Sequence, residues 1–168
     1  MADLRRQQGV GASALEFAIL TAARSGEVIG ATWAELNIAE AIWTIPAERM
    51  KALREHRIPL SPPALQIVER MRLAESPYVF PGQKLIKPLS PMAMLRVVKQ
   101  MGLDDVTVHG FRSTFKDWAS ETTHFPSEVV EMALAHSVSD KVEAAYRRGD
   151  LFAKRRELMD AWAAFCAV

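Results

Sequence analysis

The stretch AIWTIPAERMKALREHRIPL, residues 41–60, contains the two segments that favour β-structure. Residues 41–45 are rich in strand formers and end at Pro46, and residues 56–60 alternate polar and apolar side chains. The joining segment, PAERMKALREH, is charged and has no long apolar face. The pattern predicts a β-hairpin with a charged turn, and Pro59 places its second strand at a sheet edge or at its own end.

The segments on both sides of this hairpin have the periodicity of helices. Residues 12–23 carry apolar side chains at helical spacing, and residues 25–26 separate them from a second short helix. Ser61 and Ser90 each precede proline, which predicts helix starts there, with ends at about residues 73 and 100. Further helices are expected at 109–122, from residue 126 onward and at about 151–166. The fold class is therefore mainly α (α+β), with one small antiparallel sheet in the N-terminal third.

The composition is typical of one soluble globular domain: 168 residues, 49% apolar and 24% charged. The single cysteine, Cys166, excludes an intramolecular disulfide and any multi-cysteine metal site. The net charge of +1 excludes a uniformly basic surface but not a local basic groove. Glu16 interrupts the first apolar run, and no charge-free run reaches membrane-spanning length. We therefore expect a cytoplasmic chain without a signal peptide.

Two histidines and two arginines are candidate anion-binding residues. His109 and Arg112 are three residues apart on a predicted helix and share one face, although a helix face that makes surface contacts is the more common explanation of such a pair. His136 ends an apolar helix, where a capping or packing role is common. Arg24 lies three residues before Glu27, a spacing that also fits a simple local ion pair.

Lys51 and Tyr146 lie in connecting segments. Lys51 belongs to the predicted hairpin turn, where a lysine is usually only solvated. Tyr146 is one of two tyrosines and directly precedes Arg147 and Arg148, so its ring can pack or its hydroxyl can be exposed. Taken singly, neither residue indicates a function.

The order of these residues along the chain resembles that of the tyrosine recombinases, the phage integrase family. The six matching positions are Arg24, Lys51, His109, Arg112, His136 and Tyr146. The surrounding words also match: TAARSGEVIGATWAEL, IWTIPAERMKALREHRIPLS, HGFRSTFKDWAS and ALAHSVSDKVEAAYRRGD. The resemblance covers nearly the whole chain, and the lysine-bearing segment is most similar to integrases of prophages and genomic islands.

The resemblance implies that the protein is a site-specific DNA recombinase. Tyr146 would attack a backbone phosphate, forming a 3′-phosphotyrosyl bond and releasing a 5′-hydroxyl. A 5′-hydroxyl from a partner strand would then reseal the bond, so that neither ATP nor a ligase is needed. Lys51 would protonate the leaving 5′-oxygen as a general acid, and His109 would assist the tyrosine as a base or hydrogen-bond partner.

The resemblance also implies that cationic side chains take the place of a metal ion at the phosphate. Arg24 and Arg112 would bind its oxygens bidentately, and His136 would add a third donor. Glu27 would hold Arg24 in place. We therefore expect neither a metal nor another cofactor.

The remaining charged and aromatic residues are weaker candidates. Four arginines are expected to contact flanking phosphates: Arg54, Arg57, Arg147 and Arg148. His56 and His124 match no catalytic position and are interpreted as structural. Several aromatic residues are expected in the core rather than stacked on bases: Trp33, Trp43, Phe111, Phe115 and Trp118.

The resemblance further implies a larger assembly. Family members carry DNA-binding modules before the catalytic domain, so we expect residues 1–168 to be a single catalytic domain without the core-binding and arm-binding domains. Its partner would be double-stranded DNA with attachment sites, bound by a homo-tetramer that exchanges C-terminal segments. The helix ending in Trp162 and Phe165 is a candidate for that exchange, although it can equally pack within its own chain. Without DNA we expect a monomer.

Three alternatives stay open at this point. A catalytically inactive DNA-binding remnant of an integrase would keep the fold and lose the chemistry. A type IB topoisomerase or a telomere resolvase uses a similar residue set. A metal-dependent hydrolase built on His109 and His136 would be sensitive to EDTA, although the sequence shows no clustered carboxylates near those histidines.

Overall fold

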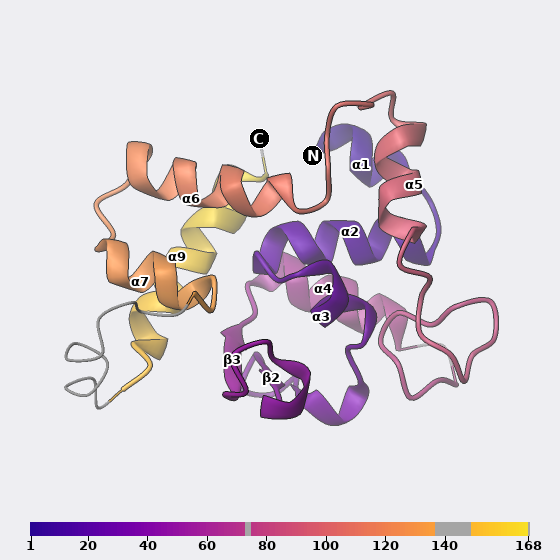
Figure 1. Cartoon of the computed structure of the whole chain (residues 1–168), viewed down its shortest axis with the longest axis horizontal. Helices are drawn as coiled ribbons and strands as arrows, with labels where there is room; N and C mark the ends of the chain where they lie inside the picture. The colour runs from indigo at the N-terminus through magenta and orange to yellow at the C-terminus, as the bar shows by residue number, and fades with distance from the viewer. Residues whose placement is uncertain (73–74, 137–148, 168) are drawn as a thin grey trace.

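The computed structural model describes residues 1–72, 75–136 and 149–167, which form a mainly helical fold with one small sheet (Figure 1). The helices are α1 (Ala2–Arg6), α2 (Val10–Thr21), α3 (Ser25–Ile29), α4 (Pro62–Met71), α5 (Ala93–Gln100), α6 (Gly110–Thr122), α7 (Ser127–Ala133) and α9 (Phe152–Phe165). The strands are β1 (Leu36–Asn37), β2 (Ile42–Ile45) and β3 (His56–Pro59), with 3-10 turns η1 (Trp33–Glu35) and η2 (Ala47–Arg49). Within the described ranges, no helix has the length and apolar character needed to cross a membrane.

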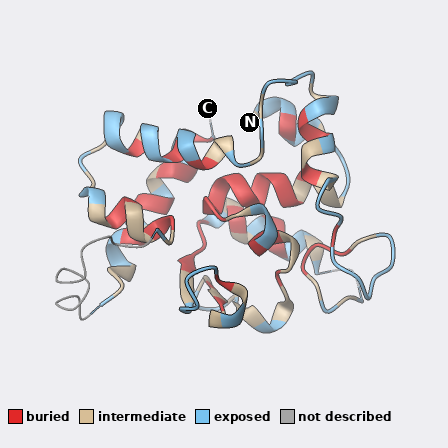
Figure 2. Ribbon diagram, in the orientation of Figure 1, coloured by how far each residue is buried: buried red, intermediate tan, exposed pale blue. Residues whose placement is uncertain are grey.

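Helix α2 forms the centre of the molecule, and Figure 2 shows it buried along most of its length. Its sequence is apolar or small on nearly every face, which is typical of an internal helix. Helices α4 and α5 pack directly against it. The ring of Phe17 lies 5.3 Å from the rings of both Trp43 and Phe80, so α2 also joins the hairpin to the buried segment at residues 79–80.

The predicted hairpin is confirmed. Strands β2 and β3 pair antiparallel, with Trp43 opposite Ile58 and Ile45 opposite His56. The sheet order is β1-β2-β3, so β3 is an edge strand, and Pro59 is its last residue, as the missing proline N–H requires. The short strand β1 was not predicted, because two residues are too few to show a periodicity.

Helices α6, α7 and α9 lie together at one side of the molecule in Figure 1. An aromatic cluster joins two of them, with the Trp162 ring 5.3 Å from Phe115 and 5.0 Å from Trp118. The Trp162 indole N–H donates to the carbonyl of Ile19 at 2.8 Å, which fastens α9 to α2. The two halves of the molecule, residues 1–100 and the described residues between 110 and 165, therefore meet at α2 and at β3, which α9 also contacts.

Two helix starts differ from the sequence prediction. Helix α5 begins at Ala93 rather than at Ser90-Pro91, because residues 90–93 form a turn closed by a bond from Ala93 N to Ser90 O at 2.9 Å. Helix α1 was not predicted at all. It has five residues and contributes one buried side chain, that of Leu4.

Candidate active site

Arg24 lies where the chain leaves the central helix. Helix α2 ends at Thr21, and Arg24 is the N-cap of α3. The buried Glu27 carboxylate accepts from the Arg24 backbone N–H at 2.8 Å and from its Nη1 at 2.7 Å. The ion pair expected from the sequence is thus present, and it fixes both the backbone and the guanidinium of Arg24.

Arg112, in the first turn of α6, is almost completely buried, with 6% of its surface exposed. Its guanidinium donates to the carbonyl of Ala22 and, at 2.7 Å, to that of Leu134. Burial and then the positive charge of Arg24 lower the pKa of Arg112 to about 10, against the opposing effect of Glu27. Arg112 therefore stays charged at neutral pH, and its charge and that of Arg24 lie within interaction range.

The two arginines bind the backbone at the end of α7, directly before His136. Ala135 has a left-handed backbone, with φ 49°. The N–H of Ala135 donates to Met132 O at 3.1 Å and the N–H of His136 to Glu131 O at 3.0 Å, which together form a Schellman motif. Arg24 Nη2 donates to Ala135 O at 3.3 Å. The same tight turn therefore contacts Arg24 and carries His136.

The His136 ring has a carboxylate partner. Its Nδ1 lies 2.6 Å from Glu131 Oε2, and the other oxygen of Glu131 lies 2.7 Å from Lys116 Nζ on α6. Burial alone would raise the pKa of Glu131, but hydrogen bonds from Lys116 and His136 outweigh it and lower that pKa. Glu131 is therefore ionised at neutral pH.

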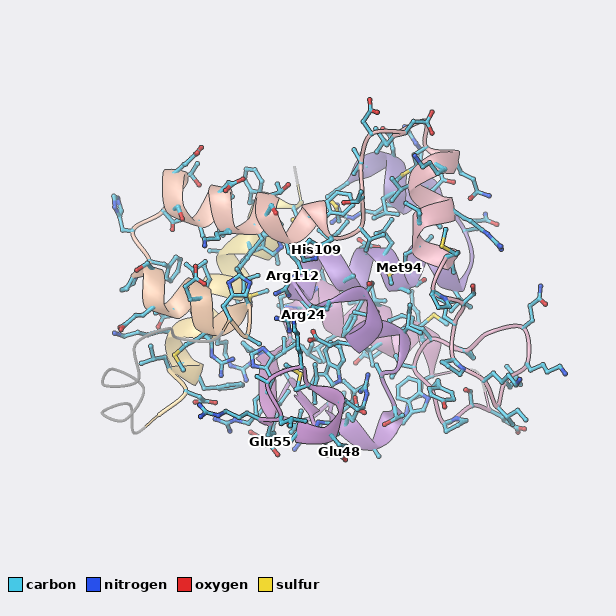
Figure 3. The ribbon with its side chains drawn as sticks, in the orientation of Figure 1. Arg24, Glu48, Glu55, Met94, His109 and Arg112 are labelled. Carbon is cyan, nitrogen blue, oxygen red and sulfur yellow. The ribbon has the colours of Figure 1, made fainter. Side chains whose placement is uncertain are left out.

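His109 is exposed at the N-cap of α6, and its carbonyl accepts from the Arg112 backbone N–H at 3.0 Å. Figure 3 shows His109, Arg112 and Arg24 one after another on the way from α6 toward α3. Residues far apart in the sequence thus meet at one place. We call Arg24, Glu27, Arg112 and His136 the arginine cluster.

Lys51 lies in the exposed loop between η2 and β3. The residues just before it anchor this loop: Arg49 Nη2 donates to Glu27 O at 2.6 Å and also pairs with the carboxylate of Glu35, and Met50 is buried. Figure 3 labels Glu48 and Glu55, which flank the loop, below Arg24. Lys51 is therefore connected to the arginine cluster through Arg49 and Glu27, while its own side chain is exposed.

Tyr146, Arg147 and Arg148 lie outside the described residues, so their predicted roles remain predictions. The structure resumes at residue 149, and Asp150 Oδ2 pairs with Arg57 at 2.7 Å and with Arg155 at 2.9 Å.

The two arginines predicted to contact DNA from the hairpin region differ in their surroundings. Arg57 combines its ion pair to Asp150 with a position 4.6 Å over the Phe152 ring. Arg54 is exposed in the Lys51 loop. Contact with flanking DNA phosphates remains a prediction for both.

His56, interpreted from sequence as structural, lies beside the arginine cluster. Burial, followed by the charge of Arg155, lowers its pKa to about 4, while Glu27 opposes the shift. Arg24 also acts on it, and the backbone of Ala133 on α7 is its hydrogen-bond partner. The feature of the sequence that could have indicated the buried position of His56 is the alternation in HRIPL, which puts His56 and the buried Ile58 on the same face of β3.

The net charge of the arginine cluster suits the binding of a singly charged anion. Two guanidinium groups and one carboxylate leave one net positive charge, and Arg24 keeps 29% of its side chain exposed. Guanidinium groups in fixed positions suit phosphate oxygens. Within residues 1–72, 75–136 and 149–167, no three histidine, cysteine or acidic side chains are grouped so as to hold a metal ion.

Comparison with known proteins agrees with this arrangement. A family model described as the phage integrase family matches residues 4–150. Prophage integrase IntA of Escherichia coli K12 is 40% identical over 151 residues, which covers 86% of this chain and 36% of that protein. Prophage integrase IntZ of the same strain is 34% identical over 154 residues, 90% of this chain and 38% of that protein. The chain therefore spans less than two fifths of the length of these relatives.

The fold is also shared with solved integrases. The integrase from mycobacterium phage Brujita superposes with a TM-score of 0.71 at 18% identity, over 95% of this chain and 54% of that one. A lambda integrase tetramer bound to a Holliday junction gives a TM-score of 0.60 at 15% identity, over 89% of this chain and 45% of that one. Because the family model covers most of the chain and the sequence relatives exceed 30% identity, the chain belongs to the phage integrase family.

Proposed function

We propose that this chain is the catalytic domain of a site-specific DNA recombinase, which cleaves and rejoins strands through a 3′-phosphotyrosyl intermediate. The observation that supports the proposal is the arginine cluster, in which Arg24 and Arg112 bind the carbonyls of Ala135 and Leu134, the two residues before His136. The proposal treats residues 1–168 as one catalytic domain that works beside DNA-binding modules, in the cytoplasm.

The phosphate would bind at the arginine cluster. Each guanidinium has five N–H donors, so bonds to backbone carbonyls hold Arg24 and Arg112 in position without using all of them. The prearranged donors would stabilise the charge that develops on the non-bridging oxygens in the transition state. No rearrangement of Arg112 is required, because burial and two carbonyls already fix it.

Proton transfer is assigned to residues at the edges of the cluster. Tyr146 would attack phosphorus and break the bond to the 5′-oxygen, which leaves with a proton from Lys51. The exposed loop of Lys51, anchored at Arg49, lets the lysine reach the leaving group. His109, exposed at the start of α6, would take or share the tyrosine proton.

The DNA partner follows from the relatives. The prophage integrases are named for integration, and the lambda integrase was solved as a tetramer on a Holliday junction. We propose attachment-site DNA as the substrate and a tetramer as the DNA-bound form. In the absence of DNA we propose a monomer, because Trp162 of the C-terminal helix bonds within its own chain, to Ile19.

Covalent trapping tests the proposal. The protein is incubated in EDTA with a pool of nicked duplexes that have randomised centres, and adducts are separated on a denaturing gel. We expect an adduct with the wild type, none with Tyr146→Phe, and about 10²–10³ less with Arg24→Gln. Tyr146→Phe should keep the DNA affinity, which separates lost chemistry from lost binding.

The same experiment distinguishes the alternatives. DNA binding without an adduct would indicate an inactive remnant. Adducts without sequence preference would indicate a topoisomerase-like enzyme, whereas a shared motif among the recovered duplexes is expected of a recombinase. Cleavage that EDTA abolishes would indicate a metal-dependent hydrolase. An adduct that persists in Tyr146→Phe would contradict the choice of nucleophile.

A further inference from the structure

We propose that Glu131 is a positioning residue for His136 and that Lys116 holds Glu131 in place. The inference rests on the proposed function, in which His136 contacts the scissile phosphate. Its geometric basis is a chain of contacts from α6 through α7 to the end of the Schellman motif. Lys116 Nζ lies 2.7 Å from Glu131 Oε1, and Glu131 Oε2 lies 2.6 Å from His136 Nδ1.

The backbone brings the carboxylate and the ring together. In the Schellman motif, the N–H of His136 bonds to the carbonyl of Glu131, so these two residues are neighbours although five positions separate them. Their side chains then pair at the same place, which makes two bonds between one pair of residues. The ring therefore has little freedom to rotate away from the turn.

Helix α6 holds the turn from the other side. Arg112 and Lys116 are one helical turn apart, and both contact the end of α7: Arg112 binds Leu134 O at 2.7 Å, and Lys116 binds Glu131. The helix that supplies Arg112 to the cluster thus also fixes the residue that orients His136. The contact between α6 and the end of α7 therefore fixes the positions of both Arg112 and His136.

The pairing determines which ring atom is available to the phosphate. With Nδ1–H donating to Glu131, Nε2 is the atom left for the substrate, and it donates only when the ring carries its second proton. The Glu131 carboxylate at 2.6 Å therefore sets which ring nitrogen is left for the substrate.

A spectroscopic test needs no DNA. Nitrogen-15 spectra of the four histidine rings are recorded for the wild type, Glu131→Gln and Glu121→Gln, with His136→Asn used to assign the signal. Glu121 is an exposed acid on α6, so Glu121→Gln removes the same negative charge but leaves the partner of the His136 ring in place. We expect a hydrogen-bonded Nδ1 proton on His136 that is lost in Glu131→Gln and kept in Glu121→Gln. The same spectrum in all three proteins would overturn the pairing.

A kinetic test addresses the role in catalysis. Adduct formation and DNA affinity are measured over a pH series for the same variants and for Lys116→Met, with the randomised nicked pool as the probe. We expect Glu131→Gln to form adducts about tenfold to a hundredfold more slowly with DNA affinity unchanged, by analogy with the partners of metal-bound histidines. The loss is expected throughout the pH series, and the adduct rate of Lys116→Met should lie between those of Glu131→Gln and the wild type.

Each other outcome contradicts a specific claim. If Glu131→Gln forms adducts at the wild-type rate, the positioning role is wrong. If cleavage, DNA affinity and thermal stability fall together, Glu131 is only structural. If the wild type forms no adduct while the ring signal responds as expected, the proposed function fails and the catalytic use of the pair fails with it, whereas the pairing itself stands.

Discussion

Buried charges around the arginine cluster are held by a small number of specific partners. Arg112 keeps its charge in a nearly closed environment because two carbonyls and the nearby Glu27 offset its burial and the repulsion from Arg24. Arg155 is just as buried and is held by Asp150 and the carbonyl of Arg57. His56 is kept neutral by its burial and by the positive charges of Arg155 and Arg24.

The neutrality of His56 makes folding stability depend on pH. Its pKa is about 4 in the folded protein and 6.5 in the unfolded chain, so below pH 6.5 the unfolded state binds the extra proton. The His56 contribution to stability is therefore complete above pH 6.5 and is lost as the pH falls toward 4, by about 3 kcal/mol in all. We expect His56→Gln to flatten the stability curve in that window, measured by urea unfolding at successive pH values.

His124 supplies the matched control for this measurement, because it is exposed. His124→Gln should leave the slope between pH 6.5 and pH 4 as it is in the wild type. A wild-type slope that His56→Gln does not change would show that carboxylates alone cause the loss of stability in acid.

At the scale of elements, the turn after α7 places an alanine in a conformation suited to glycine. Ala135 has φ 49°, which costs an L-residue about 1–2 kcal/mol, and the conformational freedom of an unfolded glycine offsets part of that. We expect Ala135→Gly to stabilise the protein by up to about 1 kcal/mol, read from the urea midpoint. Ala133→Gly, at the buried last residue of α7, should instead destabilise it by about 1 kcal/mol. Destabilisation by both substitutions would contradict the left-handed backbone at Ala135.

Elements whose apolar residues recur with a clear period could be predicted from the sequence, whereas contacts between residues on different elements could not. The HRIPL alternation and the proline at its end identified β3 and its edge position. The start of α5 was wrong, because a serine–proline pair suits a turn as well as a helix cap. The Arg24–Glu27 pair followed from a spacing of three residues. No local pattern indicated that His56 approaches Arg155 across 99 positions, since that depends on how α9 packs against β3. The contact between Glu131 and the His136 ring depends on the turn after α7, which the sequence did not indicate because Ala135 stands where glycine is usual.

In the molecule as a whole, the arginine cluster lies at the interface between the two halves. Arg24 comes from residues 1–100, whereas Arg112 and His136 come from the second half, and each arginine binds a carbonyl of the other half. The site therefore exists only when the halves are docked. The buried bond from Trp162 to Ile19 O, at 2.8 Å, is a contact at the same interface.

This arrangement predicts different costs for one substitution at two tryptophans of one aromatic cluster. Trp162→Phe removes one of the two donors to Ile19 O, which keeps the bond from the Ala22 N–H at 3.2 Å, and it leaves a smaller ring in a buried site, so we expect a loss of about 2–3 kcal/mol in urea unfolding. Trp118→Phe alters a partly buried ring on α6 whose contacts lie within its own half, so we expect about 1 kcal/mol or less. Equal losses would show that ring packing, not the bond across the interface, holds the halves together. If Trp162→Phe is the more destabilising substitution, its adduct yield should also fall more steeply with added urea than that of Trp118→Phe. The reason is that separation of the two halves moves Arg24 away from Arg112.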